Sequence, residues 1–183
     1  GLYHESMNKT FDRTDMGYFA TTNYSAYNAN FSFNRFKPWK FLLRSHNNIN
    51  VNYGNNYITG ARTDLSFNVN LFALHKNFIG MFCGTSFTPV SSYDYYEPRE
   101  DGRYFRSAQW YYVWGGFSTN YAKTFALDVN LNAGNFMKNN IQGFPEEQGF
   151  GFELKPRFRA SDKLSFIGTF NYNYDPLNPG FAD

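Results

Sequence analysis

The sequence lacks several features that define common classes of protein. Its single cysteine, Cys83, excludes a disulfide framework and a cysteine-rich zinc site. No apolar run approaches the ~18 residues of a membrane-spanning helix, and the mean hydropathy is −0.57. Charged residues make up only 17% of the chain, and the net charge of +2 comes from interspersed signs. Nothing in this charge pattern indicates a nucleic-acid partner.

The chain is rich in aromatic residues and asparagine, and its apolar and polar residues alternate. It has 183 residues, enough for one domain, with 22 Phe, 15 Tyr and 3 Trp. Apolar residues at Leu65, Phe67, Val69 and Leu71 alternate with polar residues in between. This period of two is typical of a strand with one polar and one apolar face, and helical periodicity is almost absent.

The alternation predicts eight strands, most of them longer than the mode of about 5–6 residues in globular proteins. A ninth strand within 2–11 is weakly indicated. Tight and long connections alternate along the chain, and the longest covers 89–108. The eight predicted strands cover 18–34, 39–53, 57–74, 78–88, 109–121, 125–135, 148–159 and 164–174.

Strand length and turn asymmetry together predict the fold class. A tilted transmembrane strand needs ~9–11 residues, and outer-membrane barrels have short turns on one rim and longer external loops on the other. We therefore expect residues 1–183 to form a single antiparallel up-and-down transmembrane β-barrel, or a segment of a larger one. The loop 89–108 would then be external.

Two other interpretations fit the same alternation. A soluble, secreted all-β carbohydrate-binding domain would turn the apolar face inward and the polar face outward. Asparagine, rather than lysine and glutamate, dominates the polar positions, which favours the barrel. A structural subunit of an outer-membrane complex is the second alternative.

Charged residues at polar strand positions are candidates for the lumen of such a barrel. They would make it mildly basic, as a network of ion pairs that fills the lumen or as a passage that favours anions. The candidates are Arg44, Arg62, Asp64, Asp128, Glu153, Arg157 and Arg159.

The loop 89–108 carries the best candidates for ligand binding. Its alternating charges would order the loop through ion pairs, and its tyrosines could instead stack against a ligand. The candidates are Tyr93, Tyr95, Tyr96, Glu97, Arg99 and Arg103. The aromatic segment 110–117 that follows would be an interfacial belt or a sugar-stacking platform.

The sequence contains no motif of a catalytic site or of a metal-binding site. His4, His46 and His75 are dispersed, and no motif pairs Ser45 or Ser66 with His46. Three carboxylates of the long loop lack the spacing of a calcium-binding loop. We therefore expect no catalytic residues, no metal and no cofactor.

One segment resembles a known family. Residues 91–105, SSYDYYEPREDGRYF, are similar to a motif of an uncharacterised Gram-negative outer-membrane family. In that family a C-terminal barrel domain of unknown function follows a carbohydrate-binding domain similar to family nine. The segments around 15–19, 36–39, 157–165 and 178–183 resemble it too.

The resemblance implies a location in the outer membrane and a scaffold for binding or translocation, with a link to carbohydrate uptake or surface complexes. The partners it implies are the lipid bilayer, lipopolysaccharide, and the rest of the same barrel or other outer-membrane proteins. The chain starts without Met or a leader, which fits a removed signal or a piece of a longer protein.

Overall fold

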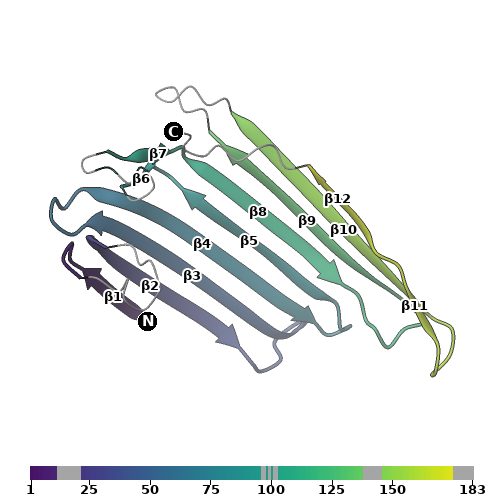
Figure 1. Cartoon of the computed structure of the whole chain (residues 1–183). Helices are drawn as coiled ribbons and strands as arrows, with labels where there is room; N and C mark the ends of the chain where they lie inside the picture. Colours follow the sequence, from purple (N-terminus) through teal and green to yellow (C-terminus); the bar gives the residue numbers. More distant parts are fainter. Residues whose placement is uncertain (12–21, 96–97, 99, 101–102, 138–145, 175–183) are drawn as a thin grey trace.

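The computed structural model describes residues 1–183 except 12–21, 96–97, 99, 101–102, 138–145 and 175–183. The regular structure of the described residues is all strand, and the main sheet is an antiparallel meander (Figure 1). The all-β antiparallel class expected from the alternation is therefore confirmed. The strands are β1 (Leu2–Met7), β2 (Tyr24–Arg35), β3 (Leu42–Asn56), β4 (Arg62–His75), β5 (Gly80–Thr88), β6 (Ser92–Asp94), β7 (Phe105–Ser107), β8 (Trp110–Ser118), β9 (Phe125–Phe136), β10 (Glu147–Arg159), β11 (Ser165–Ile167) and β12 (Phe170–Tyr174).

All eight predicted strands have counterparts, and the weakly indicated strand near the N-terminus exists as β1. The sheet order is β1-β2-β3-β4-β5-β8-β9-β10-β11, with β12 also on β10. The seven central strands are 9 to 15 residues long. The observed strand boundaries differ from the predicted ones by a few residues. For example, the predicted strand 57–74 begins in the structure at Arg62, because residues 57–61 form a turn.

The last predicted strand is split into β11 and β12, and Pro156 of β10 explains the gap. Both segments pair with β10, with Ile167 opposite Arg157 and Phe170 opposite Leu154. Proline has no backbone N–H to donate across the sheet. Between the two segments only the Gly168 amide bonds, at 3.0 Å, to the Pro156 carbonyl.

The described strands form an open sheet. β1 pairs only with β2, and β11 and β12 pair only with β10, so one side of each terminal strand has no neighbour among the described residues. The expected closed barrel is thus not formed by these strands alone. Figure 1 shows a single curved layer, with the turns 36–41, 76–79, 119–124 and 160–164 along one rim and the turn 57–61 and the β6–β7 hairpin along the other.

Apart from the β6–β7 hairpin at one rim, no second layer of described residues covers either face of the sheet. No large side chain among them is fully buried, and the buried apolar ones are only Met7, Phe105 and Ala126. Alternation sends Leu71 to one face, where it is 44% exposed, and Asn68 and Asn70 to the opposite face, where they are hydrogen-bonded and part-buried. The described residues therefore lack the dry centre of a sandwich.

Candidate functional site on the polar face

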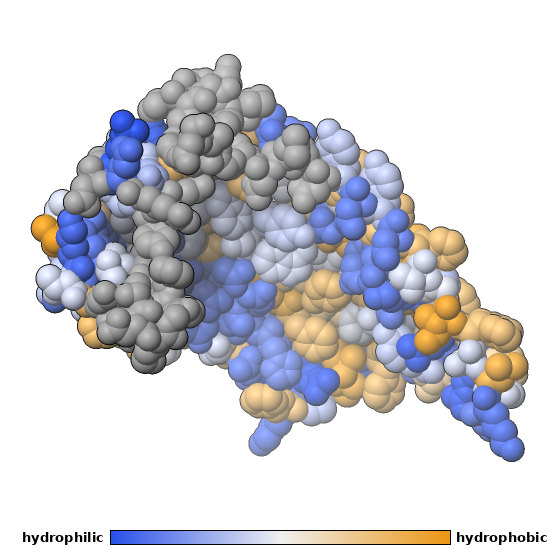
Figure 2. All heavy atoms as spheres, viewed as in Figure 1, coloured by the Kyte–Doolittle hydropathy of each residue, from blue (hydrophilic) through white to orange (hydrophobic). Residues whose placement is uncertain are grey.

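Strand alternation divides the sheet into two chemically distinct faces. The side that carries Asn50, Asn70, Ser86, Asn132 and Glu153 is called the polar face, and the opposite side is called the apolar face. Cross-strand pairing keeps each side chain on the same face as its partners, as in the pairs Asn50–Asn68 and Asn68–Ser86. Figure 2 shows the polar face as a hollow, with hydrophilic residues gathered over β2–β4.

Asparagine side chains form a hydrogen-bonded ladder across β2, β3 and β4. Asn50 is its centre: its Nδ2 donates to Asn68 Oδ1 at 2.9 Å and to Asn48 Oδ1 at 3.2 Å. Its Oδ1 accepts a bond of 2.5 Å from Asn30 Nδ2. Asn70 Nδ2 closes the ladder with bonds of 2.8 Å to Asn48 and 2.5 Å to Asn68. The ladder itself is thus uncharged, and amides supply both its donors and its acceptors.

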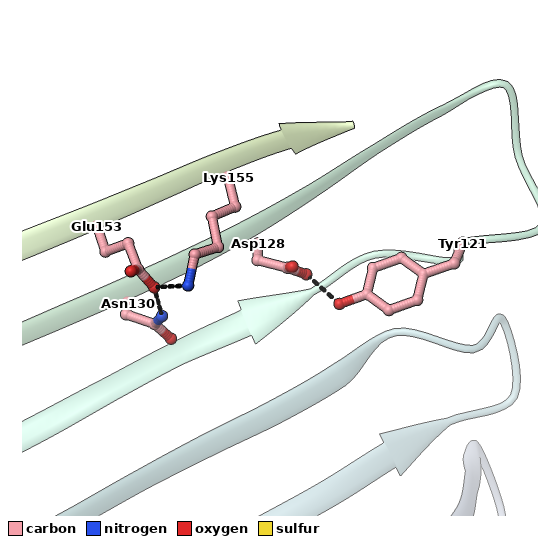
Figure 3. Close-up of polar contacts among 5 residues, drawn as sticks. All are labelled: Tyr121, Asp128, Asn130, Glu153 and Lys155. Atoms are coloured by element: carbon pink, nitrogen blue, oxygen red, sulfur yellow. Dashed lines mark hydrogen bonds and ion pairs between the residues drawn. The ribbon is translucent and has the colours of Figure 1, made fainter. Parts of the chain in front are cut away.

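Charged groups gather instead on β9 and β10 (Figure 3). Glu153 Oε1 accepts from Asn130 Nδ2 at 2.6 Å and pairs with Lys155 Nζ at 2.8 Å. Asp128 Oδ1, opposite Lys155 in the register, accepts a 2.5 Å bond from the Tyr121 hydroxyl. The structure therefore brings the candidates Asp128 and Glu153 into one cluster, with Lys155 as the cation.

The other charged candidates take no part in the hydrogen bonds and ion pair of this cluster. Arg157 follows on β10, and its guanidinium lies 4.6 Å from the centre of the Tyr121 ring. Arg159 pairs with Asp162, at 2.5 Å, in the turn after β10. Arg44 lies beside a bulge near the start of β3. Arg62 and Asp64 lie at the start of β4, at the opposite rim.

The segment 89–108, predicted as one long loop, contains a hairpin that Arg62 and Asp64 hold in place. This hairpin, β6–β7, comes from the long connection and contacts β4. Asp64 Oδ1 accepts a 3.0 Å bond from Ser92 Oγ, and Asp64 Oδ2 accepts a 3.2 Å bond from Ser66 Oγ. Arg62 Nη2 donates to the Ser91 carbonyl at 3.5 Å. The long connection is thus tied to the polar face at its rim.

In and beside the hairpin, tyrosine rings meet edge-on or tilted, and the described residues include an ion pair. The Tyr104 ring lies 5.3 Å from that of Tyr93 and 5.4 Å from that of Tyr95. Arg103 Nε pairs with Glu100 at 2.7 Å, with both side chains largely exposed. The candidates Tyr96, Glu97 and Arg99 lie outside the described residues.

Sequence reasoning missed a row of aromatic rings that lie across glycines on the polar face. Trp114 is opposite Gly84, and Phe82 is opposite Gly116. A Cβ built on Gly84 would lie 2.5 Å from Trp114 Cε2, and one on Gly116 would lie 2.8 Å from Phe82 Cζ. The rings therefore occupy the space that a side chain would fill. The sequence carries a sign of this row, because Phe82, Gly84, Trp114 and Gly116 all have even numbers, as expected for one face of two strands. An alternation of apolar and polar residues does not reveal it, because aromatic residues and glycines here occupy positions of the polar face.

The aromatic segment 110–117 divides between the two faces. Alternation sends Tyr111 and Phe117 to the apolar face, and Trp110, Tyr112 and Trp114 to the polar face. The Tyr112 and Trp114 rings lie 5.6 Å apart. The residues that could form an interfacial belt, on the apolar face, therefore differ from those that could form a stacking platform, on the polar face.

The three histidines each lie against a different aromatic ring and not beside one another. Ring centres are 4.4 Å apart for His4 and Tyr27, and 6.0 Å apart both for His46 and Phe72 and for His75 and Phe41. Among the described residues no group of three His, Cys, Asp or Glu side chains could hold a metal. The described part of the chain also contains no helix long and apolar enough to span a membrane.

Comparison with known proteins gave one family and no relatives of known role. A family model described as a domain of unknown function (DUF5916) matches residues 1–183, the whole chain. Comparison with curated proteins and with solved structures found no match.

Proposed function

This chain belongs to the DUF5916 family, and we propose that it forms part of an outer-membrane β-barrel that serves as a scaffold for binding or translocation. In this proposal the apolar face meets lipid and lipopolysaccharide, and the polar face lines a lumen. Strands from the rest of the same barrel, or from other outer-membrane proteins, complete the sheet. The proposal assigns the chain no catalytic step.

The observation that carries the proposal is the exposure of the apolar face. Phe31 is 68% exposed, Leu131 55%, Phe150 52% and Phe170 62%. Leaving apolar surface in water costs about 25 cal/mol per Å², and soluble monomers rarely expose large contiguous apolar patches. A hydrocarbon environment removes that cost, while the amides on the other side of the same strands keep their hydrogen bonds.

Strand length and backbone pairing support the same proposal. A tilted strand needs ~9–11 residues to cross a bilayer, and β5 and β8, the shortest of the seven central strands, have 9 each. In hydrocarbon each backbone N–H and C=O needs a partner within protein. Each central strand has a neighbour on both sides, but β1 pairs only with Tyr24–Ala29 of β2, so among the described strands β1, the rest of β2 and the β11–β12 edge require further strands.

Two substitutions at adjacent positions of β9 test the proposal. Leu131 lies on the apolar face and Asn132 on the polar face, opposite Trp114. Lysine facing lipid at the bilayer midplane costs about 2–4 kcal/mol, whereas lysine in a wet lumen is tolerated. We expect Leu131→Lys to abolish insertion of the full chain into outer membranes, and Asn132→Lys to preserve it. Fractionation of a Gram-negative host and heat-modifiable gel migration measure insertion.

Each alternative has its own outcome in this experiment. Wild-type chain that stays in aqueous buffer without detergent would overturn the proposal and support the soluble carbohydrate-binding domain. Wild-type chain that enters membranes only together with a second outer-membrane protein, and that gives no conductance in planar bilayers, would support the structural subunit.

A further inference from the structure

A trough of about 450 Å³ lies on the polar face, over β2, β3, β4, β5 and β8. None of the residues of the charged cluster on β9 and β10 lines it. Its lining contains aromatic rings and uncharged polar groups, and no Asp, Glu, Lys or Arg among the described residues. The side chains that matter for the argument are Asn34, His46, Asn48, Asn70, Phe82 and Trp114.

The rings of the trough are held in place by the backbone beneath them. Trp114 lies across Gly84 and Phe82 lies across Gly116, so glycine gives each ring the room to lie against the sheet. The His46 ring packs at 6.0 Å from Phe72, in the same lining. The trough therefore presents fixed ring surfaces, which cost little conformational entropy when a ligand binds.

The amides beside the rings keep hydrogen-bonding capacity after the ladder has formed. Asn48 Oδ1 accepts from Asn50 and Asn70, while its Nδ2 bonds to no described residue. Asn70 Nδ2 donates to Asn48 and Asn68, while its Oδ1 bonds to no described residue. The trough thus offers a donor and an acceptor on neighbouring strands, already oriented by the other half of each amide.

From this lining we infer that the trough binds a linear oligosaccharide of neutral hexoses. A hexose has an apolar C–H face that packs on an aromatic ring and hydroxyl groups that both donate and accept hydrogen bonds. An anionic ligand would find no lysine or arginine in the lining, and a purely apolar one would leave the amides unpaired at a cost. The inference deepens the proposed function, since it names the ligand class of that scaffold.

Titration of the full chain in detergent micelles tests the inference, with maltohexaose, cellohexaose and mannohexaose as the three probes. We expect saturable binding of at least one probe with a Kd of about 1 mM or tighter, seen by calorimetry and by a change in tryptophan fluorescence. Absence of heat and of fluorescence change with all three probes would overturn the inference.

Three variants locate the binding site. Trp114→Leu is expected to weaken binding about tenfold or more, since a stacking surface is lost, and Trp114→Phe to retain most of it. Trp39→Leu is the matched control, because Trp39 lies in the turn before β3, where Arg35 and Lys40 pack against its ring. Binding that Trp114→Leu leaves unchanged, or that Trp39→Leu weakens equally, would overturn the assignment to the trough.

Failure of the inference and failure of the proposed function are distinguishable. Chain that inserts into outer membranes but binds none of the probes overturns the inference and leaves the membrane scaffold standing. Chain that binds a probe in aqueous buffer without detergent overturns the membrane scaffold and supports the saccharide trough. Heat-modifiable migration or the strand signal in circular dichroism shows whether Trp114→Leu has folded, and Trp114→Phe provides the test if it has not.

Discussion

At the scale of single residues, the polar face depends on glycines opposite aromatic rings. Tyr112 faces Gly134 in the same way that Trp114 faces Gly84. A Cβ on Gly134 would lie 3.0 Å from Tyr112 Cδ2. Three neighbouring strands therefore share one packing device, in which a ring on one strand covers a glycine on the next. The rings are fixed by this contact and not by burial in a core.

The glycine at position 84 provides the sharpest test of this packing. In Gly84→Ala the new Cβ would lie 2.5 Å from Trp114 Cε2 and 2.7 Å from the Val69 carbonyl oxygen, so backbone as well as ring would have to move. Overpacking of this kind costs about 1–3 kcal/mol. We expect a lower urea midpoint in micelles and a changed Trp114 fluorescence.

Gly80→Ala on the same strand is the control for this test. The nearest atom to its Cβ would be Phe72 Cε2, at an ordinary contact distance of 3.6 Å. Equal midpoints for the Gly84→Ala and Gly80→Ala variants would show that the ring does not depend on the glycine.

At the scale of elements, alternation was a reliable guide wherever a strand has two different faces. β9 and β10 were predicted within one residue of their observed bounds, because polar and apolar positions alternate along most of their length. The sequence did not reveal β6 and β7, since strands of three residues are too short to show a period. It did not reveal the break between β11 and β12 either, because Pro156 acts there across the sheet.

The candidate site was predictable to a similar degree. The alternation predicted that Asp128 and Glu153 lie on the polar face. The structure places them side by side there: Glu153 bonds to Asn130 and Lys155, and Asp128, opposite Lys155, bonds to Tyr121. The trough was not predictable, because its rings come from β4, β5 and β8 and become neighbours only through cross-strand register. Register is set by turns and pairing over the whole sheet.

The attachment of the β6–β7 hairpin can be tested through Asp64. Replacing a charged acceptor costs about 1.5–3 kcal/mol, so Asp64→Ala removes the bond to Ser92 and favours an open hairpin. We expect the backbone amides of β6 and β7 to exchange with deuterium about tenfold faster, since about 1.4 kcal/mol corresponds to a factor of ten.

Asp128→Ala is the matched control for the hairpin. Asp128 lies on the polar face too, but its bond goes to Tyr121 and not to the hairpin. Unchanged exchange in Asp64→Ala, or equal acceleration in both variants, would show that the Asp64–Ser92 bond does not hold the hairpin.

At the scale of the whole molecule, the polar face is electrically uneven. Its β2–β4 half presents amides, whereas its β9–β10 half holds Glu153 and Asp128 beside Lys155 and Arg157. Under the proposed function, ions that pass along the lumen meet the amide ladder on one wall and the charges of Asp128, Glu153 and Lys155 on the other. Charges that line a passage govern its selectivity.

Arg157→Glu tests whether this wall lines a passage. The substitution replaces a cation with an anion beside Tyr121, so we expect the reversal potential of the full chain in planar bilayers to shift toward cation preference under a salt gradient. Arg159→Glu is the control, because Arg159 pairs with Asp162 in the turn. Identical reversal potentials in wild type and Arg157→Glu would refute a role of this wall in conduction.

The absence of fully buried large side chains among the described residues has an evolutionary consequence. A residue that touches few neighbours can be exchanged for another of similar polarity at little cost. Selection therefore preserves whether a position is polar or apolar more than which amino acid occupies it. Distant descendants of this sheet should therefore differ at most apolar positions, while Gly84 and Gly116, together with the rings above them, drift slowly.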